Sequence, residues 1–449
     1  MPTTRQNVPE PMDSLSSDIP IPPVVPSAAT RLLDASADNM AGRTSHAEDV
    51  LSAVVLSHSQ DDTSSDKNTH GFLVWIRRLY RGCIRLPLAI LGRLWDLASL
   101  TVMLAVVAAL PVLQLASLGY LLHAAAILAS GGKWSSALPG LRTAGKLGVF
   151  ILLATVTWLP VWFVTDLSYS AQLLIPGSRS AAVWRIAAFA ITLAWIVLVA
   201  WAAMRGGRWW HFVWPAPIRF VKQFFLPSTW QRASRDLSHL VASLSFLQLW
   251  WLGARGALGA LLWTCVPVSL IIIGLRADQF PLAIPIGVLG VASMAAVAMY
   301  LPHLQVQMAV DNRLLSIMQI QRARKRFNYA PLAHAGGLLL MCLLSIPLYL
   351  LRIEATPAEL LWAPSLIFVL FMLPVKLALG ATIGYAERRR AEGLQPRAWW
   401  VKWPGRLLSL TSITIYVFAL VLAQLFAGQG ALTMYFQHAF LVPSPLIGN

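Results

Sequence analysis

The sequence predicts an all-α protein, a polytopic helical membrane protein with about seven full crossings. Of its 449 residues, 57% are hydrophobic and only 12% are charged, a composition outside the range of ordinary soluble domains. The few charges are clustered, and the uncharged runs between them reach the roughly 18 apolar residues that span a bilayer as a helix. The expected crossings are 147–165, 186–204, 256–275, 282–301, 334–351, 361–384 and 407–427.

The N-terminal segment, residues 1–70, is expected to be a disordered acidic tail. Residues 1–66 contain ten acids and three bases, and the stretch DIPIPPVVPSAAT is rich in proline. Such a segment buries too little apolar surface to offset the entropy lost on ordering. Its start lacks a basic region followed by an apolar one, so we expect no cleavable signal peptide and a cytoplasmic tail.

Residues 71–96 are expected to form a basic amphipathic helix at the membrane surface. Arg77, Arg81 and Arg85 recur every four residues, and apolar residues fall on a different helical face. An anionic leaflet suits this pattern. An ordinary solvated helix face is the alternative, but an uncharged run begins directly after Asp96, which favours the membrane.

The membrane domain, residues 97–449, begins with an apolar block at 97–130 that is difficult to place. A single crossing there would put the basic residues before and after it on opposite sides of the membrane. We favour a broken or re-entrant element around Pro111 that returns to the cytoplasmic side. Two short tilted crossings, or partial embedding with GYLLHAAAILAS at the interface, are the alternatives.

The basic residues of the loops predict the orientation. Loops 131–146, 205–255, 302–333 and 385–406 together carry 21 Lys or Arg, whereas the segments on the other side of the crossings carry 4. Basic loops stay in the cytoplasm. We therefore expect a multi-pass protein of a bacterial inner membrane, with basic interfacial segments and the N-terminus on the cytoplasmic face and the C-terminus external.

The stretch RGGRWWHFVWPAPIRFVKQFF, residues 205–225, holds four basic residues, seven aromatic residues and no acid. Such a mixture occurs at nucleic-acid surfaces and in the headgroup layer of membranes. Because it follows a crossing that ends in the cytoplasm and no nucleic-acid-binding motif accompanies it, we expect lipid headgroups and no nucleic acid as its partner. The expected anchors here are Arg205, Arg208, Trp209, Trp210, Trp214, Arg219 and Lys222.

Lys376 lies inside a predicted crossing. An ammonium group near the bilayer centre costs roughly 2.5–3.5 kcal/mol. Its side chain could point into the bundle and bind an anion, a lipid phosphate or a backbone carbonyl, or it could extend to the headgroups. On the same helix, Gly380 and Gly384 have the GxxxG spacing that permits close helix contact.

The sequence carries no motif for catalysis. It lacks HExxH, GxGD and nucleotide-binding glycine-rich patterns. No predicted crossing has Asp or Glu near its middle, which weakens the case for an ion-coupled carrier. His211, His239, His303 and His334 are expected near the inner surface, but their spacing matches no zinc site. We expect no catalytic residue, metal site or cofactor.

One stretch, LGYLLHAAAILASGGKWSSALPGLRTAGKLGVFILL, carries a Gly-Tyr, Leu-Pro, Gly pattern. The pattern residues are Gly119, Tyr120, Leu138, Pro139 and Gly145 or Gly148. It resembles a group of uncharacterised bacterial multi-pass membrane proteins, as do YLPHLQVQMAVDNRLLSIMQIQRARKRF and QHAFLVPSPL. The resemblance covers under half of the chain. It implies a helical membrane protein and no catalytic residues, because the group has no agreed activity.

Two functions agree with these observations. The favoured one is a non-enzymatic scaffold, assembly or lipid-interacting component whose partners are membrane lipids with anionic headgroups. It rests on the basic surface segments and the missing catalytic motifs. The alternative is an uncoupled transporter or channel-like permease, which rests on prolines within the crossings and on Lys376. An intramembrane enzyme has the least support.

Reporter fusions test the orientation. Fusions after Gly177 and at the C-terminus should score as external, and a fusion near Ala391 as internal, because basic loops are retained in the cytoplasm. The opposite pattern would refute the predicted topology.

Overall fold

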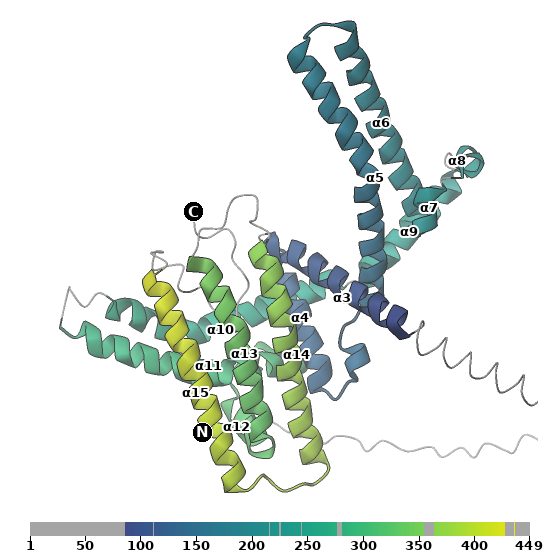
Figure 1. Ribbon diagram of the computed structural model, residues 1–449. Coiled ribbons are helices and arrows are strands. Elements are labelled where there is room, and N and C mark those ends of the chain that lie inside the picture. Colours follow the sequence, from purple (N-terminus) through teal and green to yellow (C-terminus); the bar gives the residue numbers. More distant parts are fainter. Residues whose placement is uncertain are drawn as a thin grey trace, which may run out of the picture. The chain divides into compact units, whose positions relative to one another are not determined.

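A computed structural model describes residues 86–426, apart from 111, 215, 224–225, 244, 276–280 and 354–362, together with Tyr435. Every regular element within these residues is a helix, which confirms the all-α prediction (Figure 1). Eight of the helices are long and apolar enough to cross a membrane. The chain divides into two units, Met1–Leu88 and Ala89–Asn449. The expected tail and the anchors Arg77, Arg81 and Arg85 lie outside the described residues.

The helices follow one another with short connections. In chain order they are α3 (Leu86–Ala109), α4 (Gln114–Ala129), η2 (Trp134–Ser136), α5 (Leu141–Leu174), α6 (Arg179–Met204), α7 (Trp209–Val213), α8 (Pro217–Gln223), α9 (Pro227–Ser243), α10 (Phe246–Gly274), α11 (Ala283–Asp311), η3 (Leu314–Met318), α12 (Ile320–Tyr329), α13 (Pro331–Ile353), α14 (Ala363–Ala391) and α15 (Trp399–Phe426).

The first apolar block is broken into α3 and α4. Between the two helices Val112 has a φ of 68°, a left-handed conformation that β-branched residues rarely adopt. Helix α3 has 24 residues and is itself one of the eight candidate spans, so the structure has one more long apolar helix than the sequence predicted. Helix α4 has only 16 residues, fewer than a full crossing needs.

Helix α4 is the most deeply enclosed element of the bundle. It packs against α10, α11 and α14 (Figure 1), and twelve of its residues are buried. A Cβ atom on Gly119 would lie 1.7 Å from the carbonyl oxygen of Leu249 in α10, and one on Gly253 would lie 1.8 Å from that of Leu115. No larger side chain fits at such distances, so glycine permits the backbones of α4 and α10 to touch.

Two glycines of α14 approach α4 in the same way. A Cβ atom on Gly380 would lie 2.2 Å from the carbonyl oxygen of Ala125, and one on Gly384 would lie 2.3 Å from that of Leu128. Helix α4 is therefore in backbone contact with two long helices, α10 and α14. Other long helices pack around these two: α11 lies along α10, and α13 packs against α14 and α15.

Helix α11 extends ten residues beyond the crossing expected at 282–301. It continues through Pro302 to Asp311, and the expected loop 302–333 contains η3 and α12. A proline removes one helical hydrogen bond, but every residue from Leu301 to Met308 is buried. Packing on all sides therefore keeps this part of the helix intact.

Helices α5 and α6 form a hairpin. The rings of Trp158 and Trp195 lie 4.7 Å apart, and the Trp195 indole donates a hydrogen bond to the carbonyl of Ala154 at 3.2 Å. Only 6% of the residues in the apolar stretch of α5 are buried. The expected loop 205–255 that follows contains the helices α7, α8 and α9 and the start of α10.

The residues of the Gly-Tyr, Leu-Pro, Gly pattern make packing contacts. The Tyr120 hydroxyl donates to the carbonyl of Pro139 at 2.9 Å, which ties α4 to the segment before α5. A Cβ atom on Gly145 would lie 1.7 Å from the Asp96 side chain, and one on Gly148 would lie 2.1 Å from that of Ser99. The pattern therefore marks places where α5 touches α3 and where the chain turns back on α4.

The substitution Gly380→Ala should lower the thermal unfolding midpoint in detergent, because the new methyl group would overlap a backbone carbonyl. Overpacking of this kind typically costs about 1–3 kcal/mol. The matched control is Gly336→Ala in α13, where a Cβ atom would meet nothing within 4 Å and alanine favours the helix. Equal midpoints for both variants would contradict the close packing of α4 and α14.

Candidate lipid-binding site

A cavity of about 570 Å³ lies between α11, α12, α13 and α15. Its polar lining side chains include Tyr300, His303, Arg324, His334, Arg406 and Ser409. Its apolar lining side chains include Met299, Phe327, Leu338 and Leu410. Among the residues that the structure describes, no acidic side chain lines it. We call this cavity the His–Arg cavity; it combines positive charge with apolar surface.

Two stacked imidazoles form one wall of the His–Arg cavity. His303 on α11 and His334 on α13 have ring centroids 4.6 Å apart and planes within 18°, and both residues are buried. Nδ1 of His334 lies 3.1 Å from the Ala330 carbonyl, to which its N–H donates. The Nε2 atoms of both rings are buried without a hydrogen-bond partner in the described part of the chain.

Two arginines supply the positive charge of the cavity. Nε of Arg324 donates to the Tyr300 hydroxyl at 3.2 Å, and the guanidinium lies over the same ring, 5.5 Å from its centroid. Arg406 reaches the cavity from α15. Neither arginine takes part in an ion pair among the described residues. Their charges are therefore available to an anion.

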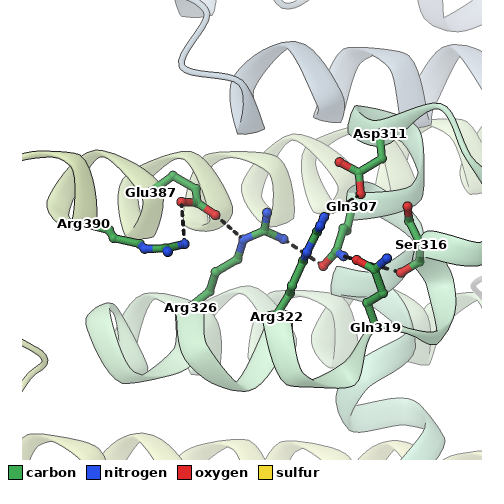
Figure 2. Close-up of polar contacts among 8 residues, drawn as sticks. All are labelled: Gln307, Asp311, Ser316, Gln319, Arg322, Arg326, Glu387 and Arg390. Atoms are coloured by element: carbon green, nitrogen blue, oxygen red, sulfur yellow. Dashed lines mark hydrogen bonds and ion pairs between the residues drawn. The ribbon is translucent and has the colours of Figure 1, made fainter. Parts of the chain in front are cut away.

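A polar clamp made by Gln307, Arg326 and Glu387 fixes α12 beside the cavity (Figure 2). Arg326 on α12 donates from Nε to Glu387 of α14 at 2.6 Å and from Nη1 to Gln307 of α11 at 2.9 Å. Gln307 in turn donates to Gln319 at 3.1 Å. Successive helical positions point about 100° apart, so Arg324 and Arg326 face different ways. Arg326 belongs to the clamp, and Arg324 lines the cavity.

Further ion pairs surround the clamp. Arg322 pairs with Asp311 at 3.1 Å, and Arg390 lies 3.9 Å from Glu387 (Figure 2). Both pairs are partly exposed and contribute little by themselves. Arg326 differs from them, because only 14% of its side chain is exposed.

Lys376 points into the bundle and does not extend to the headgroups. The residue is 2% exposed, and its Nζ donates to Oε1 of Gln305 at 2.7 Å. Gln305 donates from Nε2 to the carbonyl of Gly256 at 3.2 Å, which links α14, α11 and α10. Lys376 does not line the His–Arg cavity. Its partner is a side-chain amide, which the sequence did not identify.

The expected interfacial anchors from 205 to 222 gather around the end of α6. Arg205 is partly buried, and it donates to the carbonyl of Trp214 at 3.0 Å. Trp209 and Trp210 stack with their ring centroids 4.1 Å apart. The remaining anchors are exposed: Arg208, Trp209, Trp210, Trp214, Arg219 and Lys222.

The sequence did not predict the contact of His303 with His334 or the polar clamp. Both depend on the continuation of α11 past Pro302, where the predicted crossing ended. A signal for that continuation was present, because His303, Gln307 and Asp311 recur every four residues and so share one helical face. Arg324 and Arg406 line one cavity because α12 and α15 both pack against α11 and α13, which no local pattern encodes.

Comparison with known proteins gives no match: no family model fits the chain, and no curated protein or solved structure is similar to it.

A double-mutant cycle tests the pairing of Lys376 with Gln305. Lys376→Met removes one hydrogen bond and should cost about 1–3 kcal/mol of stability. Gln305→Leu removes the acceptor of a buried ammonium and should cost more, about 3–5 kcal/mol. The double variant should be more stable than the sum of the two losses implies, because the two side chains interact. Additive losses in thermal unfolding would show that they do not.

Proposed function

We propose that this chain is a non-enzymatic membrane protein that binds the headgroup of an anionic phospholipid in the His–Arg cavity. The observation that carries the proposal is a cavity with an apolar wall and two arginines, neither of which has an acidic partner among the described residues. A phospholipid has the same two parts, an anionic phosphate and an acyl chain. The long apolar helices support the assignment to a membrane, and the lining of the cavity supports an anionic phospholipid as the ligand.

The phosphate fits the polar wall. An arginine guanidinium presents several donors in a plane that matches two phosphate oxygens. Arg324 is already held in place by Tyr300, so little freedom is lost when it binds. Arg406 supplies the second charge from a different helix.

The acyl chain fits the apolar wall. Met299, Phe327, Leu338 and Leu410 line it, and burial of methylene groups against such side chains contributes about 0.8 kcal/mol for each. The cavity volume of about 570 Å³ falls within the usual range of ligand pockets, about 300–1,000 Å³.

The charges of Arg324 and Arg406 favour a headgroup that carries no cation. They repel the ammonium of phosphatidylethanolamine, whereas the glycerol of phosphatidylglycerol is uncharged. Phosphatidylglycerol is therefore the headgroup chemistry that fits best.

The basic segments around the cavity support its location at the inner leaflet. Helix α12 belongs to the basic segment 302–333, and Arg406 closes the basic segment 385–406, both of which are expected in the cytoplasm. The inner leaflet carries the negative surface potential that attracts such segments.

Native mass spectrometry of the purified chain, titrated with phosphatidylglycerol, tests the proposal. The double variant Arg324→Gln/Arg406→Gln should bind at least about tenfold more weakly, since it loses two charge-assisted contacts. The matched control is Lys325→Gln/Lys402→Gln, which removes the same charge from the same two helices at positions that do not line the cavity.

The control loses the same general attraction to an anionic lipid but keeps both contacts inside the cavity, so it should bind at least about tenfold more tightly than the cavity variant. Phosphatidylethanolamine should bind more weakly than phosphatidylglycerol to the unchanged protein. Equal affinity of both double variants for phosphatidylglycerol would refute the site.

A further inference from the structure

A second cavity, of about 390 Å³, lies at the end of the α5–α6 hairpin, where α6, α8 and α9 meet. Three arginines line it: Arg205 just after α6, Arg219 on α8 and Arg232 on α9. Within the part of the chain that the structure describes, no carboxylate lines this cavity and no acid pairs with any of the three. We call it the three-arginine cavity. It shares no lining residue with the His–Arg cavity.

The surrounding contacts orient Arg205. Its guanidinium lies 5.9 Å from the ring centroid of Trp201 and donates to the carbonyl of Trp214 at 3.0 Å. Trp201 is itself only 2% exposed and packs edge-on against Phe220 of α8 at 5.5 Å. One arginine of the cavity is therefore fixed before any ligand arrives, which lowers the entropy lost on binding.

The rest of the lining also suits an anion. Ser228 and Thr229 lie in the first turn of α9, and their hydroxyls can donate hydrogen bonds. This helix has 17 residues, and the positive end of its dipole faces the same region. Burial lowers the pKa of His211, and the charges of Arg205 and Arg208 lower it further. The positive charge at neutral pH therefore comes from the arginines.

We propose that the three-arginine cavity binds a phosphate group, supplied by the headgroup of an anionic lipid. Three guanidinium groups in a lining dominated by polar side chains match phosphate oxygens and offer little surface to an acyl chain. Free phosphate has the same chemistry, but the exposed indoles beside the cavity favour the lipid. Trp209, Trp210 and Trp214 are 52%, 58% and 68% exposed. Tryptophan side chains are enriched at the membrane–water interface.

The test uses full-length protein in phosphatidylcholine nanodiscs and calorimetric titration. All measurements are made in the Arg324→Gln/Arg406→Gln background, so that the His–Arg cavity contributes as little as possible. One arm adds inorganic phosphate, and the other adds dihexanoyl phosphatidic acid. The lining variant is Arg232→Gln. Its control is Arg235→Gln, which removes the same charge from the same helix, α9, at a position outside the cavity.

The lining variant should bind the short-chain lipid at least about tenfold more weakly than the background protein, and the control should bind within about twofold. Inorganic phosphate should compete with the lipid and bind less tightly. Matching thermal unfolding midpoints for the two variants would show that both are folded. Equal lipid affinity of the lining variant and its control would overturn the site, and binding of phosphate without binding of the lipid would overturn its assignment to a lipid headgroup.

Discussion

Backbone contact around α4 is the constraint on which the rest of the bundle depends. Between helices in lipid there is little hydrophobic driving force, so close van der Waals packing has to hold them together. Gly119 and Gly253 let α4 touch α10, and Gly380 and Gly384 let it touch α14. A helix of 16 residues thereby fixes the positions of two helices of 29 residues each.

The candidate lipid site follows from this packing. Helix α14, held by α4, carries Glu387, and α11, packed on α10, carries Gln307. Arg326 donates hydrogen bonds to both side chains, so the position of α12 depends on the positions of α11 and α14. That placement directs Arg324 toward the cavity. Lys376 is a further link among the same helices through Gln305, and its amide partner gives the transporter interpretation less support than the cavity gives to lipid binding.

The fold class and the long apolar helices were predictable because an apolar composition and the length of each apolar run indicate directly whether a helix can cross a lipid bilayer. The bounds of α11 were not predictable. A proline in the interior of a helix usually kinks or ends it, but Pro302 lies in a stretch of α11 whose residues are all buried. Lys376 was recognised as unusual from its position alone, but its partner is 71 residues away in the sequence. The two arginines of the His–Arg cavity are likewise brought together only by tertiary packing.

The most direct test of the central claim is to locate the bound lipid. Photoreactive phosphatidylglycerol, cross-linked to the protein in nanodiscs and mapped by peptide mass spectrometry, should mark the cavity-lining parts of α11, α12, α13 and α15. An excess of unlabelled phosphatidylglycerol should reduce this cross-linking, and the Arg324→Gln/Arg406→Gln variant should lose it. Cross-links spread over the exposed faces of α5 and α6, with none at the His–Arg cavity, would contradict the account.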